Sequence, residues 1–413
     1  MKIVKLSAEQ FDKYASTHRY RNFYQTSQYA NVMVKFGYHA QFLGIASDEN
    51  KLLGATLILY KEVFMGNKVA YAPHGILFDY EDEVNTKEFV KILKKTLSTQ
   101  GIMFLRMDPY IPLTIRDSEG NTMNFNNKGD DIIKNLTKAG FKYRGKNLYF
   151  ETEKPRWEAL ILLQRDIRDI FNKVDKRTRN KLRKATNSGV EVYKSTNNDI
   201  NTLYRFIGKK EKKPINYFKT ILNSFDGDVD IYIAKINTET FLINSRRSYE
   251  KEVEFSETLA QKIQDMSLDP KDRETYLNKK MESDKLVTVY KNNLLKATDL
   301  LKSNPDGIPI GAAMVIKYDN AAYLLTEGID EGYGTLNAST IIKWKLIEDY
   351  NQQGFKYVNL NGVVGDFENQ NEYSGLNESK LGFNSIVTEY IGEFDIITNG
   401  LMYNLYQKTN NKK

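Results

Sequence analysis

The sequence predicts a mixed α/β protein with two related domains and a helical hairpin inserted into the second one. The first observation is length, because 413 residues exceed what a single compact core usually organises. The second is an internal repeat, in which the order of strands and helices in the first half returns in the second half. The third is the segment 242–302, where apolar or small residues recur at alternating steps of four and three among charged ones.

The amino-acid composition narrows the classes of function. Hydrophobic residues make up 41% and charged residues 27% of the chain, which is typical of a soluble globular protein. Cysteine is absent, which excludes a disulfide framework and a thiolate metal site. The three histidines, His18, His39 and His74, lack the spacing of metal ligands, so we expect no zinc site. Because neither a signal-peptide pattern nor an apolar run of about 18 residues occurs, we expect a cytoplasmic protein.

The first half begins with a helix capped by Ser7 and a second helix that ends near Gly37. The strands expected next, and the amphipathic helix that follows them, cover residues 42–46, 53–60, 69–72 and 85–98. A buried strand then leads to Asp108, a position where functional side chains often collect. Asp108 is either a site residue or a cap of the turn before Pro109, and the residues alone leave both interpretations open.

Residues 166–188 predict a helix with a positively charged exposed face. In the stretch 173–184 of this helix, Asp175 is the only acidic residue beside seven basic ones: Lys173, Lys176, Arg177, Arg179, Lys181, Arg183 and Lys184. A solvated helix usually mixes both signs of charge, so this face favours a phosphate-rich partner such as RNA, a pyrophosphate or an anionic lipid. No pattern of a folded RNA-reading module accompanies it. A second basic cluster, Lys209–Lys213, is either an anion-binding loop or a solvated charged turn.

The internal repeat links four segments of the first half to four of the second. They carry similar residues in the same order: 53–58 with 310–315, 85–98 with 338–351, 100–108 with 353–361, and 138–142 with 380–384. The order strand, strand, helix, strand fits the sheet of acyltransferases, so we predict two tandem acetyltransferase-like (GNAT-type) domains. The expected bounds of the first domain, the second domain and the inserted hairpin are 1–150, 151–241 plus 306–413, and 242–305.

The inserted segment predicts an antiparallel pair of helices. Each helix carries a seam of apolar or small residues in heptad spacing: Tyr249, Val253, Ser256, Ala260 and Ile263 in the first, and Val287, Tyr290, Leu294, Ala297 and Leu301 in the second. Asp269 suits an N-cap and Pro270 a first helical turn, so the second helix should begin there. The alternative is two ordinary surface helices. In a projecting arm, the seam would be structural and the charged outer face would be available to RNA or to a partner subunit.

Motifs spread along the whole chain agree with one known family. They are Tyr24–Thr26, Phe36–Tyr38, Tyr71–Gly75, Asp79–Tyr80, Leu105–Pro112, Lys176–Asn180, Lys184, Gly189–Val190, Lys213–Phe218, Lys380–Asn384 and Glu389–Phe394. Together they resemble the Fem-type peptidyltransferases (FemA, FemB, FemX and the MurM/MurN group), whose fold is twin acetyltransferase-like domains with, in the FemA branch, a hairpin in the second. The resemblance implies an enzyme that moves an amino acid from aminoacyl-tRNA to the stem peptide of a peptidoglycan precursor, building an interpeptide bridge, without a metal or redox cofactor.

The resemblance also implies roles for single residues. Lys35 is the candidate for holding the phosphates of the precursor, with a spacing one residue longer than in the family. Lys213 and Tyr217 stand where the family has an Arg and a Tyr that bind the nucleotide or phosphate end, and a lysine there keeps the charge but loses the bidentate fork. Arg106 and Tyr110 belong to another matching motif and are expected to contact substrate.

The implied chemistry is acyl transfer, in which a stem-peptide amine attacks the ester carbonyl of the aminoacyl-tRNA. Because this ester is already activated, the enzyme mainly positions both substrates and stabilises charge. Lys380 aligns with the family lysine implicated in the transfer step, so we expect it to face the developing oxyanion or the leaving ribose oxygen. Asp108 could accept a proton or orient the amine. The sequence has no clear coenzyme A pyrophosphate loop and no P-loop, which favours a donor other than acetyl-coenzyme A.

The expected partners are an aminoacyl-tRNA and a lipid-linked or nucleotide-linked muropeptide precursor. The basic helix and the hairpin would contact tRNA phosphates or an anionic membrane surface at the inner face of the membrane. A homo- or hetero-oligomer with a related protein is a further expectation. Two other classes stay open at this point: a non-catalytic RNA-binding or scaffolding protein that keeps the twin fold, and a small-molecule N-acyltransferase.

Overall fold

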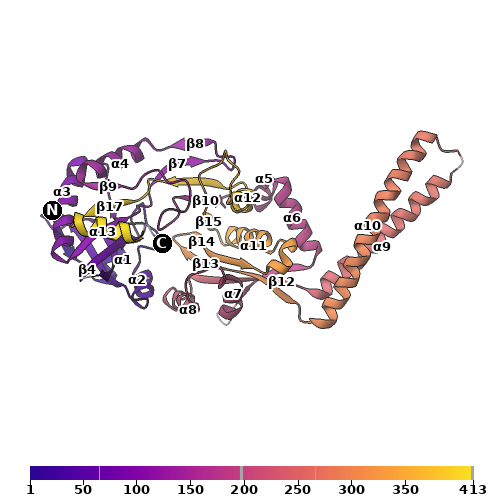
Figure 1. Ribbon diagram of the computed structural model, residues 1–413, viewed down its shortest axis with the longest axis horizontal. Coiled ribbons are helices and arrows are strands. Elements are labelled where there is room, and N and C mark those ends of the chain that lie inside the picture. Colours follow the sequence, from indigo (N-terminus) through magenta and orange to yellow (C-terminus); the bar gives the residue numbers. More distant parts are fainter. Residues whose placement is uncertain (65, 196–198, 266, 411–413) are drawn as a thin grey trace.

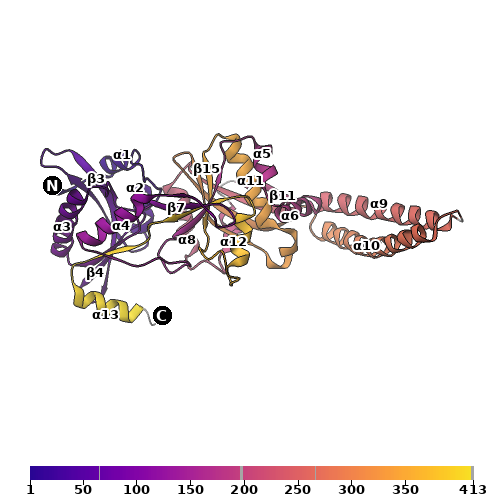
Figure 2. The same cartoon turned by 90° about the horizontal axis from the view of Figure 1, so that it is seen from above.

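The computed structural model describes residues 1–64, 66–195, 199–265 and 267–410. Two mixed sheets lie next to each other in a globular body, and a pair of long helices projects from the end opposite the N-terminus (Figure 1). The view in Figure 2, turned by 90°, shows the same projecting pair and the separate position of the C-terminal helix α13 (Gly400–Asn410). Among the described residues, no helix is long and apolar enough to cross a membrane.

The first sheet comes mainly from the N-terminal half. Its strands lie in the order β1 (Lys2–Lys5), β2 (His39–Ala46), β3 (Leu52–Phe64), β4 (Asn67–Ala72), β6 (Ile102–Met107), β17 (Phe394–Ile397) and β9 (Phe141–Tyr143), and β5 (Leu77–Phe78) pairs with β3. Strands β1 to β4 are antiparallel, whereas β4 and β6 are parallel and are connected through α3 (Glu83–Thr99). The other helices of this half are α1 (Ala8–Ala15), α2 (Ser27–Val34) and α4 (Asn127–Ala139).

The second sheet comes mainly from the C-terminal half. Its strands lie in the order β11 (Val190–Ser195), β12 (Val229–Ile236), β13 (Ile308–Tyr318), β14 (Ala321–Ile329), β15 (Tyr357–Gly362), β10 (Trp157–Leu162), β16 (Ile386–Tyr390), β7 (Pro112–Arg116) and β8 (Thr122–Phe125). Again four antiparallel strands are followed by a helix, α11 (Ala338–Gln352), and a parallel strand, β15. The remaining helices are α5 (Ile167–Lys173), α6 (Lys176–Asn187), α7 (Ile200–Ile207), α8 (Ile215–Ser224), α12 (Ser374–Leu381) and the 3₁₀ helix η2 (Glu331–Leu336).

The two sheets therefore repeat one order of elements, as the sequence predicted. The paired segments fall on β3 and β13, on α3 and α11, and on β6 and β15. The predicted fold class, a tandem pair of acetyltransferase-like units with a helical insertion in the second, is confirmed.

Strands cross the predicted boundary at residue 150 in both directions. The hairpin of β7 and β8, from the first half, completes the edge of the second sheet through β16. In return β17, near the C-terminus, lies between β6 and β9 of the first sheet. A strand pattern in the sequence says which residues face a core but not which sheet they join, so this exchange has no sequence signal.

The pairing of β14 and β15 opens a wedge in the second sheet. Their parallel register begins with Ala321 beside Tyr357 and ends with Tyr323 beside Asn359, although β14 continues to Ile329 and β15 continues to Gly362. Unpaired strand ends that run on in this way diverge and leave room between them for a ligand or for side chains. In the first sheet the equivalent strands β4 and β6 stay paired to their last residues.

One apolar cluster joins the two halves. It contains Phe23 and Leu57 from the first half together with Phe225, Met314 and Tyr323 from the second, all buried. Because these side chains share one packed core, the junction between the halves is a fixed part of the fold rather than a loose contact. Residues that line the junction are thereby held in place.

The predicted helical hairpin is confirmed. Helices α9 (Thr238–Gln264) and α10 (Pro270–Ser303) pack against each other and are inserted between β12 and β13, two strands that pair directly (Figure 1). Asp269 caps α10 by accepting a hydrogen bond from the backbone N–H of Lys271 at 2.8 Å. The seam is partly polar, since Ser256 Oγ donates to Asp284 at 2.7 Å and Ser283 Oγ donates to Glu252 at 2.6 Å.

Candidate active site

The wedge between β14 and β15 contains a pocket of about 220 Å³. Lys380 of α12 reaches into it and donates a hydrogen bond from Nζ to the backbone oxygen of Gly362 at 2.6 Å. Helix α12 is fixed there because the Asn377 amide bonds to both the N–H and the oxygen of Val364, each at 3.0 Å. The full lining comprises Phe150, Pro155, Leu324, Leu325, Thr326, Glu327, Leu360, Asn361, Gly362, Leu376 and Lys380.

Burial changes the acid–base behaviour of Lys380. Its side chain is only 7% exposed, and burial lowers its pKa from 10.5 to about 8. The negative charge of Glu327 raises this pKa and the positive charge of Lys343 lowers it further, so the two neighbours act in opposite directions. A lysine with a pKa near 8 is still mainly an ammonium at neutral pH but releases its proton more readily than a free lysine.

A buried ion pair forms the wall beside Lys380. The Lys343 side chain, on α11, is fully buried and its Nζ lies 2.5 Å from Oε1 of Glu327 on β14. Ser339, one turn before Lys343, accepts a second hydrogen bond from Nζ at 2.5 Å. These contacts offset the cost of removing the lysine from water and fix the carboxylate of Glu327 at the pocket wall. Sequence analysis missed Lys343, because residues 338–351 were predicted only as a helix of the repeat, and it also missed Glu327 on β14.

A smaller hollow of about 20 Å³ adjoins the wedge pocket at the junction of the two halves. The two cavities share Pro155, Leu324, Leu325 and Asn361 as lining residues. The hollow is also lined by Phe23, Tyr24, His74, Lys154, Glu158, Tyr323 and Asn359. Residues of the first half thus face a hollow that adjoins the pocket of Lys380.

Glu158 is the carboxylate of this hollow. It is 6% exposed, and its Oε2 accepts three hydrogen bonds, from Tyr110 Oη at 3.0 Å, Tyr390 Oη at 2.9 Å and Asn359 Nδ2 at 2.8 Å. Burial raises its pKa, which these three donors partly oppose. Sequence analysis missed Glu158, although a single charged residue within the apolar run from Trp157 to Leu163 was a usable signal.

Asp108 lies just beyond β6 and is bonded on both carboxylate oxygens. Oδ2 accepts from Tyr71 Oη and Oδ1 accepts from the His74 backbone N–H, both at 2.7 Å. Burial and the nearby charge of Glu393 raise the pKa of Asp108 well above its usual range. His74 is also buried, and burial lowers its pKa to about 3, so it is a neutral ring here. Through these contacts Asp108 holds the chain at His74, a role that differs from the predicted cap before Pro109, and its role as a site residue stays a prediction.

Arg106 has a structural partner far away in the sequence. Its Nε and Nη2 bond to the two carboxylate oxygens of Asp395 on β17 at 2.9 and 3.1 Å. This bidentate pair ties the C-terminal strand to the first sheet and leaves Arg106 occupied. Tyr110, in contrast, reaches the hollow through Glu158 and stacks on Tyr390 with ring centroids 4.4 Å apart.

The three residues expected to hold the precursor lie together near α2 and α8. Lys35 is the exposed C-cap of α2, and the ring of the next residue, Phe36, contacts Tyr217 of α8 at 5.3 Å. Lys213 is exposed and its Nζ lies 5.2 Å from the centroid of the Tyr217 ring. Tyr217 interacts in turn with Tyr29, next to the hollow. Through Tyr217 and Tyr29 this cluster is connected to Tyr24, a lining residue of the hollow.

The predicted basic helix is divided in two. The single helix expected over residues 166–188 is wrong, because Val174 leaves helical geometry and Asp175 caps a new helix, α6, by accepting from Thr178 N at 2.6 Å. A cavity of about 480 Å³ lies on one face of α6, lined by Lys176, Arg177, Asn180, Lys181, Lys184 and Asn337. The other two basic residues expected to bind phosphate, Arg179 and Arg183, are not part of this lining.

The basic face of α6 lies next to the helix that carries Lys380. The backbone N–H of Asp175 donates to the oxygen of Gly382 at 2.9 Å, just after α12. Arg177 and Lys181 both form ion pairs with Glu378 of α12. At its other side α6 contacts α9 at the base of the arm, as both ribbon views show (Figures 1 and 2). The basic residues of α6 thus lie between the base of the arm and the helix that carries Lys380.

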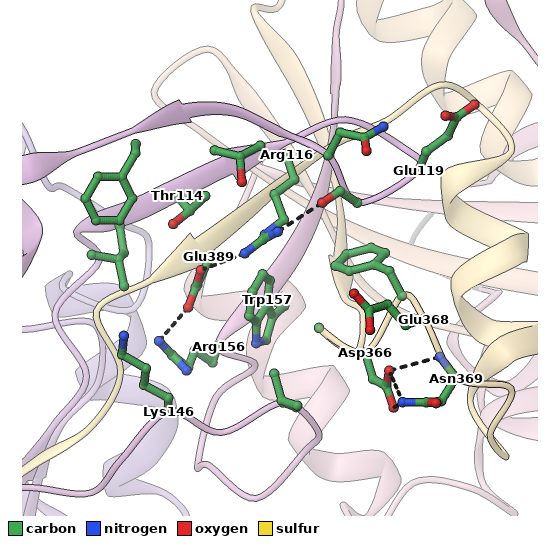
Figure 3. A pocket seen from close by; sticks show the side chains of 18 residues that line it. Thr114, Arg116, Glu119, Lys146, Arg156, Trp157, Asp366, Glu368, Asn369 and Glu389 are labelled. Atoms are coloured by element: carbon green, nitrogen blue, oxygen red, sulfur yellow. Dashed lines mark hydrogen bonds and ion pairs between the residues drawn. The ribbon is translucent and has the colours of Figure 1, made fainter.

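A further cavity, of about 680 Å³, lies on the opposite face of the second sheet (Figure 3). Neighbouring residues of a strand point to opposite faces, so Trp157 lines this cavity whereas Glu158 lines the hollow. Figure 3 shows Arg156 directed at Glu389, with which it pairs at 2.6 Å, and Arg116 above them. Lys380 is not among its lining residues, so this cavity is separate from the candidate active site.

No metal site accompanies the pockets within the described part of the chain, where no group of three or more His, Asp or Glu side chains could hold an ion. The Lys380 ammonium, with its lowered pKa, lines the wedge pocket. The buried carboxylate of Glu158 and two tyrosines, Tyr24 and Tyr323, line the adjoining hollow. Such groups can stabilise an oxyanion and move protons in acyl transfer.

Comparison with known proteins identifies the architecture. Residues 6–411 match the model of the FemAB family. Aminoacyltransferase FemA of Staphylococcus epidermidis is 24% identical over 422 residues, covering 98% of each chain. Lipid II:glycine glycyltransferase of S. epidermidis is 22% identical over 421 residues, covering 99% of this chain and 95% of that protein. The crystal structure of FemX superposes with a TM-score of 0.72 at 19% identity, covering 98% of this chain and 99% of that one.

Proposed function

The chain belongs to the FemAB family, and from that premise we propose that it transfers an amino acid from an aminoacyl-tRNA to the stem-peptide amine of a peptidoglycan precursor. The named relatives are an aminoacyltransferase and a glycyltransferase, so acyl transfer is the enzyme class. The observation that carries the proposal is the position of Lys380, in a wedge pocket that adjoins a hollow at the junction of the two halves.

In this proposal the ester of the donor enters the wedge pocket. At about 220 Å³ the pocket is smaller than the roughly 300–1,000 Å³ of typical ligand sites, which suits the compact aminoacyl end of a tRNA. The Nζ of Lys380, which donates to the Gly362 oxygen, turns its other protons toward the ester. When the amine attacks, this ammonium stabilises the negative charge that develops on the carbonyl oxygen.

The tRNA phosphates are assigned to the basic face of α6 and the base of the arm. Four basic residues line the cavity on that face: Lys176, Arg177, Lys181 and Lys184. Because α6 is bonded to the end of α12, a phosphate backbone held on α6 would direct its 3′ end toward Lys380. Charge neutralisation by such residues supplies affinity without reading sequence, so this contact suits any tRNA.

The precursor is assigned to the side formed by Lys35, Lys213 and Tyr217. Two of these residues are exposed cations that suit phosphate groups, and the tyrosine interacts with Tyr29, whose ring packs on Tyr24 of the hollow. We favour a lipid-linked precursor, because one relative is named for action on lipid II. The reaction would then occur at the inner face of the cytoplasmic membrane.

The test is to incubate the protein with a pool of charged tRNAs and with lipid-linked and nucleotide-linked precursors in separate reactions. Mass spectrometry of the lipid-linked precursor should reveal an increment of one or more amino-acid residues, absent when the tRNA is first digested with ribonuclease. An increment only on the nucleotide-linked precursor would overturn the lipid assignment. No increment on either precursor would overturn the proposed function.

A further inference from the structure

Glu158 holds a position that no structural role explains completely. The three hydrogen bonds that it accepts from described residues all go to Oε2, so none of them occupies Oε1, and the Glu158 side chain lines the hollow. The hollow has a volume of about 20 Å³, enough for one water-sized group. The head of a primary amine has that size. Of the described residues that line the hollow, only Glu158 carries a carboxylate.

We propose that Glu158 is the catalytic base that takes the proton from the attacking amine of the stem peptide, while Lys380 supplies a proton to the leaving ribose oxygen. This inference rests on the proposed function and adds to it the path of the protons. Asp108 is another carboxylate near the junction, but its two oxygens are bonded to Tyr71 and His74, and it does not line the hollow. It acts as a positioning residue.

The environments of Glu158 and Lys380 shift the pKa values of the two side chains in opposite directions. Burial raises the pKa of Glu158 and lowers the pKa of Lys380 to about 8, which brings a base and an acid closer to neutral pH. The positive charge of Lys380 in turn lowers the pKa of Glu158. The other titratable groups that face Glu158 or its hollow are Tyr24, Tyr110, Tyr323, Tyr357, Tyr390, His74 and Lys154.

The proposed step balances in atoms and charge. The neutral amine nitrogen forms a bond to the ester carbonyl carbon, and the bond from that carbon to the ribose oxygen breaks. The nitrogen gives one proton to Glu158, which becomes a neutral acid, and the ribose oxygen receives one proton from Lys380, which becomes a neutral amine. Transfer of the proton from Glu158 to Lys380, directly or through water, restores both groups after release of the amide and the tRNA.

The substitution Glu158→Gln tests the role of the carboxylate with little change in shape. The amide oxygen can still accept from Tyr110, Tyr390 and Asn359, and the amide nitrogen replaces Oε1 at the hollow. Saturating single-turnover transfer should slow by about 10²–10⁴-fold near neutral pH, the usual contribution of a general base. The binding of charged tRNA and of precursor should stay within about threefold of wild type.

The pH dependence separates a catalytic from a structural role. A base acts only when deprotonated, so the wild-type transfer rate should fall as the pH falls through the pKa of Glu158. This adds a second acid limb to the wild-type pH–rate profile, beside the limb that protonation of the attacking amine causes in both proteins. The ratio of wild-type to Glu158→Gln rates should therefore shrink in that pH range. A constant ratio at every pH, or a wild-type rate in the variant, would overturn the proposal. The matched control is Glu389→Gln, a buried glutamate on the opposite face, which should lower thermal stability but keep both limbs.

A milder variant keeps the inference testable if Glu158→Gln does not fold. Tyr390→Phe removes one donor to Oε2, and that donor lowers the pKa of Glu158, so the second acid limb should move to higher pH. An unmoved limb in a folded Tyr390→Phe variant would rule out Glu158 as the titrating group. Absence of any transfer by wild type would instead defeat the proposed function, so the two failures are distinguishable.

Discussion

Replacing Lys380 with methionine should abolish most activity without destabilising the fold. Loss of one donor to a developing oxyanion costs about 10²–10³-fold in rate, so transfer should fall by at least that factor. Lowering the pKa of a lysine from 10.5 to about 8 corresponds to about 3 kcal/mol of folding free energy, which the methionine variant recovers. Leaving the Gly362 oxygen unpaired costs about 1–3 kcal/mol. The two effects nearly cancel, so stability at neutral pH should change by less than about 2 kcal/mol.

The pH dependence of unfolding supplies the control for Lys380→Met. The unfolded chain keeps its lysine proton up to about pH 10.5, whereas the folded protein releases it above about pH 8. The unfolding free energy of wild type should therefore rise relative to the variant by up to about 3 kcal/mol across that window. Chemical denaturation of both proteins at several pH values measures this difference. A constant difference across the window, or near-normal transfer by the variant, would refute the role assigned to Lys380.

Three further perturbations follow from the site. Lys184→Ala should raise the KM for charged tRNA and should reduce the slope of log affinity against log salt by about 0.7–0.9. Arg183→Ala is the control and should have smaller effects, because Arg183 does not line the basic cavity. Equal effects of the two substitutions in a filter-binding titration would contradict this. Replacing residues 242–305 by a short linker should leave both halves folded, because β12 and β13 pair directly, but should weaken transfer; wild-type turnover would make the arm dispensable. Asp108→Asn should lower the unfolding temperature and leave the single-turnover rate within about tenfold of wild type, whereas a loss of about 10²-fold or more would make Asp108 a proton acceptor after all.

The fold could be predicted because the sequence repeats itself. Four paired segments fixed the order of strands and helices in both halves, and the heptad seam identified the arm. The exchange of β17 and of the β7–β8 hairpin between the sheets could not be predicted, because alternation of apolar residues is the same whichever sheet a strand joins. The order of strands and helices could thus be read from the sequence, whereas the sheet that each strand joins could not.

The site was harder to predict, because a charged residue at a strand end can either bind substrate or hold the fold together, and its sequence pattern is the same in both cases. Arg106 and Asp108 were both named as site residues, and those roles stay predictions: in the structure Arg106 pairs with Asp395, 289 positions away, and Asp108 accepts from the backbone of His74. Lys380 was identified from its match to a family motif and not from the residues around it. Glu158 interrupts an apolar strand and could have been found from that fact alone, since an unpaired charge rarely occupies such a place without a function.

The central claim is that the aminoacyl group passes from tRNA to precursor within the wedge pocket of Lys380. Its most direct measurement is a rapid-quench single turnover with tRNA charged with a labelled amino acid and an excess of lipid-linked precursor. We predict that label leaves the tRNA and appears on the stem peptide in equal amounts and at one rate, and that both events slow together in Lys380→Met. Label lost from the tRNA to water, or transfer that persists at the wild-type rate in Lys380→Met, would contradict the account.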